Sequence, residues 1–175
     1  MSDTSAKQLE HTDHKPAQHR FPMVLVLDNF QVPANVGSIF RLADALGVDK
    51  LYLTGSTPVP PNRNIKKTSR STEKFVSFEY VSDPLVAIAK LKQLSYQIVA
   101  LEITDSSQPL AEVEFGQTEK IAVILGAESS GVSQALLDVS DYHVHIPMQG
   151  QNSSMNVAVA CGIAVYQLIQ AMRRA

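Results

Sequence analysis

The arrangement of apolar residues restricts the fold of this sequence more than any other feature. Short apolar runs, continuous rather than alternating with polar residues, are separated by stretches with helical periodicity. Continuous runs of this length are typical of strands buried on both faces. We predict strands at 23–27, 51–53, 98–101, 121–125 and 144–146, and helices at 36–46, 85–94 and 155–172. The alternation predicts an α/β fold with a mostly parallel sheet and helices on both faces.

The length of the chain fits one domain. The sequence has 175 residues, of which 45% are hydrophobic, enough to bury a core without disulfides or metals. Residues 1–20 are polar without apolar periodicity, so we predict a disordered leader there and one folded domain at 21–175. The leader contains His11, His14 and His19 but no carboxylate-rich or helical context, and we predict no metal site.

Two features bear on the location of the protein. No apolar run approaches the ~20 residues that a membrane-spanning helix requires, and the N-terminus lacks the basic-then-apolar layout of a signal peptide. The single cysteine, Cys161, excludes an intrachain disulfide and lies in an apolar run where a small buried residue is expected. We expect a cytoplasmic protein that does not contact a membrane and in which Cys161 serves packing.

Positive charge is concentrated in one segment. The formal net charge is −2, so an anionic partner would have to be met locally. The polar, proline-rich segment 54–69 is too long for a simple connector, and we predict a ligand-binding loop there. The basic cluster in and just after this segment consists of Arg63, Lys66, Lys67, Arg70 and Lys74, opposed only by Glu73.

Three polar segments directly follow predicted strands, the place where open α/β sheets bind ligands. In the first, Asn35 is a natural helix N-cap, and Arg41 lies roughly opposite the apolar positions of the predicted helix. In the second, 126–131, a glycine ends a strand and Glu128 projects from a turn. A helix cap with a solvated arginine, and a turn with a solvated glutamate, remain simpler interpretations of these two segments.

The third segment, 146–157, combines consecutive hydrogen-bonding side chains with a helix that opens near Ser154. A helix N-terminus offers free N–H groups to an anion, although capping by Ser153 and Ser154 would also explain the pattern. His143 and His145 alternate on the preceding strand without a nearby acid in the sequence, which favours a structural role. No P-loop or G-x-G-x-x-G motif is present, which argues against simple NTPase and dinucleotide-binding functions.

In their order along the chain, the three segments resemble the motifs of the SpoU (TrmH-like) family of the SPOUT class. The first resembles N-x-x-x-x-x-R-x-A-D-A-x-G-V, from Asn35 to Val48. The second resembles G-A-E-x-x-G at 126–131, and the third resembles I-P-M-x-G-x-x-S-S-x-N-V at 146–157. The resemblance covers residues 21–172, nearly all of the predicted domain.

The resemblance implies an RNA 2′-O-methyltransferase that uses S-adenosylmethionine, with a deep C-terminal trefoil knot. It also implies a tRNA or rRNA substrate and a homodimer whose interface helps to build the active site. Carried over by position, the cofactor contacts fall on Leu101, Gly126, Ile146, Met148 and Met155. The catalytic group falls on Asn35, Arg41, Glu128, Ser154 and Asn156. The basic cluster would then bind RNA phosphates without recognising the base sequence.

The sequence departs from the family pattern at a few positions. Met155 stands where leucine is common, which is a volume-conserving change. Residues 69–72 (Ser-Arg-Ser-Thr) replace the Ser-x-Gly-Ala turn of many relatives, which bears on RNA recognition more than on chemistry. Two other functions stay open: a non-catalytic RNA-binding protein that keeps the fold, and an RNA base methyltransferase. Retention of the whole catalytic set disfavours the first, and the Ser-x-Asn pattern of the third motif disfavours the second.

Overall fold

The structure is a computed structural model that describes residues 6–8, 10, 13, 15, 20–115 and 120–173. Most of the predicted leader, with His11, His14 and His19, lies outside the described residues. The leader and the domain boundary after residue 20 therefore stay predictions.

Strands and helices alternate along the described part of the chain, as the apolar pattern predicts. The strands are β1 (Phe21–Asp28), β2 (Val48–Thr54), β3 (Ser77–Val81), β4 (Gln97–Leu101), β5 (Gln108–Pro109), β6 (Ile121–Leu125) and β7 (Tyr142–His145). The helices are α1 (Pro33–Leu46), α2 (Arg63–Ser69), α3 (Pro84–Gln93), α4 (Gln134–Asp138) and α5 (Val157–Met172), with 3-10 turns η2 (Thr72–Lys74) and η3 (Leu110–Glu112). Each predicted strand and helix is present, with ends that differ by a few residues.

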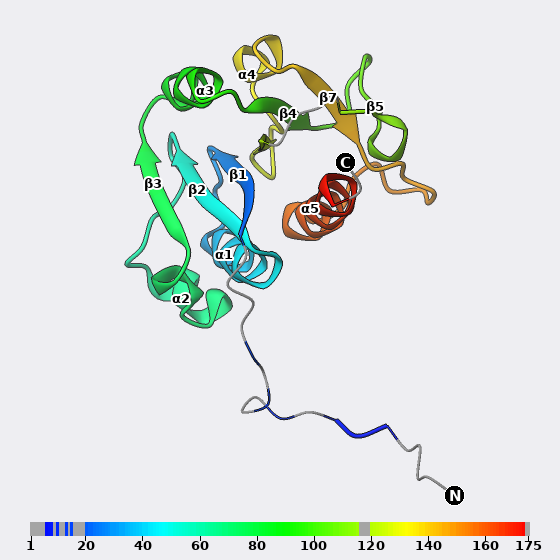
Figure 1. Cartoon of the computed structure of the whole chain (residues 1–175). Coiled ribbons are helices and arrows are strands. Elements are labelled where there is room, and N and C mark those ends of the chain that lie inside the picture. The colour runs from blue at the N-terminus through cyan, green and yellow to red at the C-terminus, as the bar shows by residue number, and fades with distance from the viewer. Residues whose placement is uncertain are drawn as a thin grey trace, which may run out of the picture.

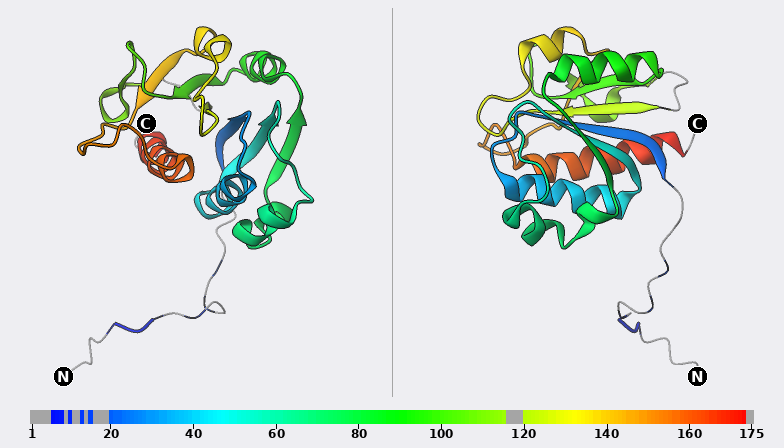
Figure 2. Two further views of the ribbon diagram at one scale, coloured as in Figure 1. Left: turned by 180° about the vertical axis from the view of Figure 1, so that it is seen from behind. Right: turned by 90° about the vertical axis from the view of Figure 1, so that its left-hand side faces the viewer.

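The strands form one sheet in the order β3-β2-β1-β6-β4-β7-β5, and every neighbouring pair runs parallel. Helices α1 and α5 lie on one face of the sheet, and α3 and α4 lie on the other (Figures 1 and 2). This arrangement confirms the predicted α/β class with helices on both faces, whereas the trefoil knot stays a prediction. Because the strands are parallel, the segments that follow β1, β4, β6 and β7 converge at one edge of the sheet.

The two-sided core explains why the apolar runs are continuous. Along β1, Met23 and Leu25 pack into the core cluster that includes α1 and α5, whereas Val24 and Val26 pack into the cluster that includes α3 and α4. Successive side chains of a strand point to opposite faces, so a strand covered on both faces is apolar at every position. Strand β6 shows the same effect, since all of its residues are buried.

Cys161 belongs to the core, as predicted. Its side chain is fully buried in the cluster beneath α5, and burial raises the pKa of its thiol above the usual range. A thiol in this setting is inert, so Cys161 acts as a small apolar residue. Across the residues that the structure describes, no helix combines the length and the apolar character needed to cross a bilayer.

Both helices that carry predicted site residues begin at positions that differ from the prediction. Helix α1 starts at Pro33 with Val32 as its N-cap, so the prediction that Asn35 caps it was wrong. Proline favours the first helical position because its missing N–H needs no partner there, and this moves the start upstream. Helix α5 starts at Val157, and its cap is Asn156 rather than a serine. The Asn156 side chain accepts hydrogen bonds from the N–H groups of Ala158 and Val159.

The predicted loop at 54–69 contains a helix, which corrects the prediction of irregular structure over its full length. Asn62 caps α2 by accepting hydrogen bonds from the N–H groups of Asn64 and Ile65. Helix α2 packs closely on α1, since a Cβ atom on Gly37 would lie 2.4 Å from the carbonyl oxygen of Ile65. The helix is short and mostly polar, which is why apolar periodicity gave no signal for it.

The turn after α2 carries backbone strain. Arg70 and Ser71 both have positive φ, at 57° and 73°, in the left-handed region that favours glycine. Ser71 is the position of the glycine in the Ser-x-Gly-Ala pattern with which the sequence was compared. A left-handed conformation costs a residue with a side chain roughly 1–2 kcal/mol.

We therefore expect Ser71→Gly to stabilise the protein by about 1 kcal/mol, because it removes this strain. Denaturant unfolding would measure the change in the free energy of unfolding. Ser77→Gly is the matched control: Ser77 is an exposed strand residue, where glycine should destabilise by about 0.5–1 kcal/mol. If Ser71→Gly is instead less stable than wild type, the serine side chain stabilises the folded protein by more than the positive φ destabilises it.

Candidate active site

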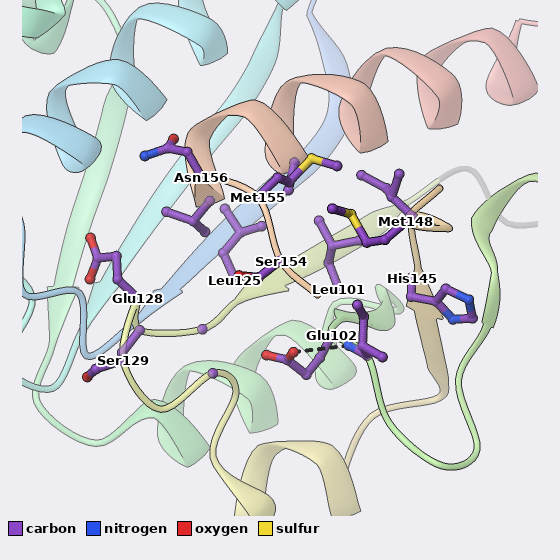
Figure 3. Close-up of a pocket in the computed structure, with 17 residues that line it drawn as sticks. Leu101, Glu102, Leu125, Glu128, Ser129, His145, Met148, Ser154, Met155 and Asn156 are labelled. Carbon is purple, nitrogen blue, oxygen red and sulfur yellow. Dashed lines mark hydrogen bonds between the residues drawn. The ribbon is translucent and has the colours of Figure 1, made fainter. Parts of the chain in front are cut away.

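A cavity of about 480 Å³ opens at the carboxyl ends of β4, β6 and β7 (Figure 3). Its wall is formed by the segments that follow these strands and by the first turns of α5. A cavity of this volume is in the range of sites for small organic molecules. The lining residues are Leu101, Glu102, Ile103, Leu125, Gly126, Ala127, Glu128, Ser129, Gly131, His145, Ile146, Met148, Ser154, Met155, Asn156, Val157 and Ala160.

The structure brings the predicted cofactor residues together. All five line the cavity: Leu101, Gly126, Ile146, Met148 and Met155. They come from three separate strand ends and from the segment before α5, and only the parallel sheet makes these segments neighbours. The wall is mixed, with apolar side chains beside carboxylates and backbone groups, as is typical of ligand sites.

The loop after β6 closes on itself at the cavity wall. Ala127 and Gly131 exchange two backbone hydrogen bonds, of 3.1 and 2.8 Å between nitrogen and oxygen. Gly126 permits this closure, because a Cβ atom on it would lie 2.1 Å from the backbone of Gly131 and Val132. Glu128 therefore projects from the tip of a compact, closed turn.

Two carboxylates from neighbouring strands hold the end of this loop. The N–H of Val132 donates to Glu102 Oε2 at 3.0 Å, and the N–H of Ser133 donates to Asp28 Oδ2 at 3.3 Å. Glu102 follows β4 and Asp28 ends β1, the two strands that flank β6 in the sheet. The position of the loop is thus set by side chains on both sides of its own strand.

Three of the predicted catalytic residues form one hydrogen-bonded group. The Asn35 side chain donates through Nδ2 to Glu128 Oε1 at 2.6 Å, and its Oδ1 accepts from Asn156 Nδ2 at 3.1 Å. The other Glu128 oxygen, Oε2, accepts from the N–H of Gln31 at 3.0 Å. Asn156 also caps α5 with its oxygen, so the group ties the starts of α1 and α5 to the loop after β6.

These contacts affect the charge state of Glu128. Partial burial acts to raise the pKa of its carboxyl, but the hydrogen bonds from the Asn35 side chain and the Gln31 backbone outweigh burial, and the pKa is lowered overall. Hydrogen bonds of this kind stabilise the ionised form. Glu128 is therefore a fixed negative acceptor at neutral pH.

The remaining two predicted catalytic residues lie apart from this group. Ser154 lines the cavity with an exposed side chain. Arg41 is exposed on α1 and does not line the cavity. It follows Asn35 by six residues, which on a helix means about 9 Å along the axis and roughly 240° around it. Arg41 therefore points away from the Glu128 group of its own chain.

The predicted RNA-binding residues are all exposed, on α2, its C-terminal cap and η2: Arg63, Lys66, Lys67, Arg70 and Lys74. None of them lines the cavity. Arg41 lies near this cluster, because it is one helical turn beyond Gly37 on the face of α1 that meets α2. Helix geometry thus places Arg41 on the side of α1 that meets α2, the helix that carries much of the cluster.

Among the lining residues that the sequence did not identify, Glu102 and His145 carry ionisable side chains. Glu102 follows a short strand, a position that could have marked it as facing a ligand. His145 lines the cavity too, and its Nδ1 lies 2.9 Å from Ser107 Oγ, a contact consistent with the predicted structural role. Among the described residues, no three His, Cys, Asp or Glu side chains gather in a way that could hold a metal ion.

Helix α5 exposes an apolar strip on its outer face. Val159, Ile163 and Tyr166 are 55%, 43% and 58% exposed and recur at the spacing of one helix face. Ile163 and Tyr166 also line a second hollow of about 510 Å³, between α5 and the segment after β5. Three large apolar side chains in a row on one helix mark a surface suited to a protein partner.

Comparison with known proteins gives consistent matches over this domain. The model of the SpoU rRNA Methylase family matches residues 22–166. A Staphylococcus saprophyticus protein assigned to the TrmH family of tRNA/rRNA methyltransferases is 30% identical over 154 residues, which is 88% of this chain and 61% of that protein. The chain thus spans less than two thirds of that relative.

Solved structures match the fold. The SpoU methyltransferase AviRb from Streptomyces viridochromogenes, in complex with AdoMet, has a TM-score of 0.76 at 25% identity, covering 91% of this chain and 59% of that chain. A structure described for 2-OH methylation of C/U34 on tRNA has a TM-score of 0.75 at 25% identity. It covers 87% of this chain and 97% of that chain, so the two are of similar size.

Proposed function

Because the chain belongs to the SpoU rRNA methylase family, we propose that it transfers a methyl group from S-adenosylmethionine to a ribose 2′-hydroxyl of RNA. One observation carries the proposal: a cavity lined by all five predicted cofactor residues lies beside the Asn35–Glu128–Asn156 group. The residues predicted to bind the cofactor and those predicted to be catalytic thus include neighbours at one edge of the sheet. The activity, the RNA substrate and the partner subunit are all part of this proposal.

The cavity fits S-adenosylmethionine in size and chemistry. Leu101, Ile146 and Met148 offer apolar surface to a nucleoside ring, and Gly126 leaves backbone groups accessible. The wall has carboxylates but no lysine or arginine, which suits a ligand with a cationic centre. When bound there, the cofactor supplies a reactive methyl group. The AdoMet complex of the Streptomyces relative supports this assignment.

The Asn35–Glu128–Asn156 group would position the ribose. Methyl transfer to a hydroxyl requires alignment of the attacking oxygen and stabilisation of the charge that develops on it. Asn156 donates one hydrogen bond to Asn35, and Glu128 accepts from both Asn35 and the Gln31 backbone. Such preorganised polar groups fix a hydroxyl without reorganising during the reaction. Glu128, ionised at neutral pH, acts as the acceptor that orients Asn35.

Arg41 would act on the RNA backbone. A guanidinium stays protonated over the accessible pH range, so it is a poor base. Binding a phosphate and stabilising negative charge are roles that fit its chemistry. Since Arg41 points away from the Glu128 group of its own chain, we propose that a second copy supplies it to the cavity. The apolar strip of Val159, Ile163 and Tyr166 supports a homodimer, because two such strips would cover each other.

The ribose is the favoured acceptor within RNA. The relative of similar size is described for 2-OH methylation of tRNA, and the chain keeps the Ser154-x-Asn156 pattern beside the cavity.

Incubating the purified protein with radiolabelled S-adenosylmethionine and either tRNA or rRNA would test the proposal. Nucleoside analysis should find 2′-O-methylated products from one of the two RNAs. A methyl group found on a base would contradict ribose methylation, and a folded protein that neither binds the cofactor nor transfers a methyl group would contradict catalysis.

The basic cluster should bind RNA through phosphates. We expect Lys66→Ala with Lys67→Ala to weaken RNA binding and to lower the slope of log affinity against log salt by roughly 1.5, or about 0.7 for each lost contact to single-stranded RNA. Filter binding at several salt concentrations would measure this. Lys90→Ala with Lys92→Ala on α3, across the sheet, is the matched control and should leave the slope unchanged. An unaltered slope in the first variant would remove α2 from the RNA-binding surface.

A further inference from the structure

We propose that the Glu102 carboxylate makes the cavity prefer the cationic methyl donor over the uncharged product that remains after methyl transfer. Glu102 would thus be a specificity-determining residue for exchange of the cofactor. The inference rests on the proposed function, since it takes the cavity to be the S-adenosylmethionine site. It adds a role for a residue that lies outside the three sequence motifs.

The position of Glu102 is fixed by the backbone around it. Its Oε1 accepts a hydrogen bond from the N–H of Ile103 at 3.0 Å, and its Oε2 accepts from the N–H of Val132 at 3.0 Å. Gly131 leaves room for the carboxylate, because a Cβ atom there would lie 2.4 Å from Oε2. The side chain is therefore held in place at the cavity wall rather than free to turn outward (Figure 3).

No cation balances this carboxylate in the described part of the chain. Both of its hydrogen-bond donors are neutral N–H groups, and none of the ion pairs among the described residues involves it. The cavity lining contains no lysine or arginine. A half-buried charge without a counter-ion attracts a cation more strongly than a solvated surface charge does.

Glu128, the second carboxylate of the cavity wall, has different hydrogen-bond partners. Both oxygens of Glu128 are occupied by Asn35 and by the N–H of Gln31, at the end of the cavity where the ribose-positioning group lies. Figure 3 shows Glu102 and Glu128 on separate parts of the wall. Glu102 is bonded only by backbone N–H groups and lies outside the ribose-positioning group, so we assign the interaction with the cofactor's charge to it.

The two forms of the cofactor differ by one charge at sulfur. In the transfer, a ribose oxygen forms a bond to the methyl carbon, and the carbon–sulfur bond breaks with its electron pair staying on sulfur. The hydroxyl proton passes to solvent water. The sulfur is positively charged before this step and neutral after it. A fixed negative charge in the cavity therefore holds the donor more strongly than S-adenosylhomocysteine, and exchange of product for donor is favoured.

Calorimetric titration of the intact protein with S-adenosylmethionine and with S-adenosylhomocysteine would test this. In Glu102→Gln, we expect the ratio of donor to product affinity to fall about tenfold relative to wild type. Glu102→Asp keeps the charge and should keep the ratio within about threefold. Asp105→Asn removes an exposed acid that does not line the cavity, and should leave the ratio unchanged.

The outcomes separate the possible failures. Equal weakening of both ligands in Glu102→Gln would show that Glu102 only holds the loop at Val132, and would overturn the inference while leaving the proposed function intact. If Glu102→Gln does not fold, the Glu102→Asp protein decides: a ratio lowered as far as tenfold despite the retained charge would overturn the inference. A wild-type protein that binds neither ligand would overturn the cofactor site and the inference with it.

Discussion

A Gly126→Ala protein should bind S-adenosylmethionine about a hundredfold more weakly than wild type. The added Cβ atom would lie 2.1 Å from the backbone of Gly131 and Val132, a distance that no rotation of a side chain can relieve. The loop must open to admit it, and overpacking of this kind costs up to about 3 kcal/mol. If the displaced loop weakens the binding free energy of the cofactor by this amount, the affinity falls about a hundredfold.

Calorimetric titration would measure the affinity, and thermal unfolding would show whether the variant remains folded. Gly150→Ala is a matched control, because Gly150 lies in the segment that leads to α5 and a Cβ atom there would meet nothing within 4 Å. The control should bind the cofactor as the wild type does. Unchanged binding by a folded Gly126→Ala protein would mean that the loop after β6 does not shape the cofactor site.

Arg41→Ala and Glu128→Gln should each reduce methyl transfer about a hundredfold or more, because each removes a charged group aimed at the substrate or at its positioning residues. If the two residues act across a dimer interface, the variants should complement each other. A heterodimer of the two, isolated through two different tags, has one site with both native residues and one site with neither. It should therefore recover about half of the wild-type activity, as the two-fold symmetry of a dimer requires.

The reciprocal heterodimer is the control. Pairing a wild-type chain with a chain that carries both substitutions leaves each site with one native residue if the site is shared, so this dimer should be inactive. If both residues instead act within one chain, the control should keep half of the activity and the first heterodimer none. A protein that sediments as a monomer while fully active would contradict the shared site altogether.

The fold class and part of the cavity wall could be predicted from the amino-acid sequence. Short continuous apolar runs are typical of strands with both faces covered, and their alternation with helical periodicity predicted the layered α/β fold. Parallel strands place their carboxyl ends at one edge, so the polar segments after β1, β6 and β7 were expected to converge. Leu101, Gly126 and Met148 were identified from the sequence by its resemblance to the SpoU family, and all three line the cavity.

The contacts of the side chains in those segments depend on packing in three dimensions, which the sequence pattern does not reveal. Asn35 has the right chemistry for a helix cap, yet Pro33 moves the start of α1 upstream, and Asn35 contacts Glu128 instead, 93 residues away. The role of Glu102 depends on Val132 of a neighbouring strand's loop. Such contacts join segments whose separation in sequence carries no local signal. Apolar periodicity is a property of one segment, whereas a hydrogen-bonded site is a property of the packing between several, and so only the fold reveals it.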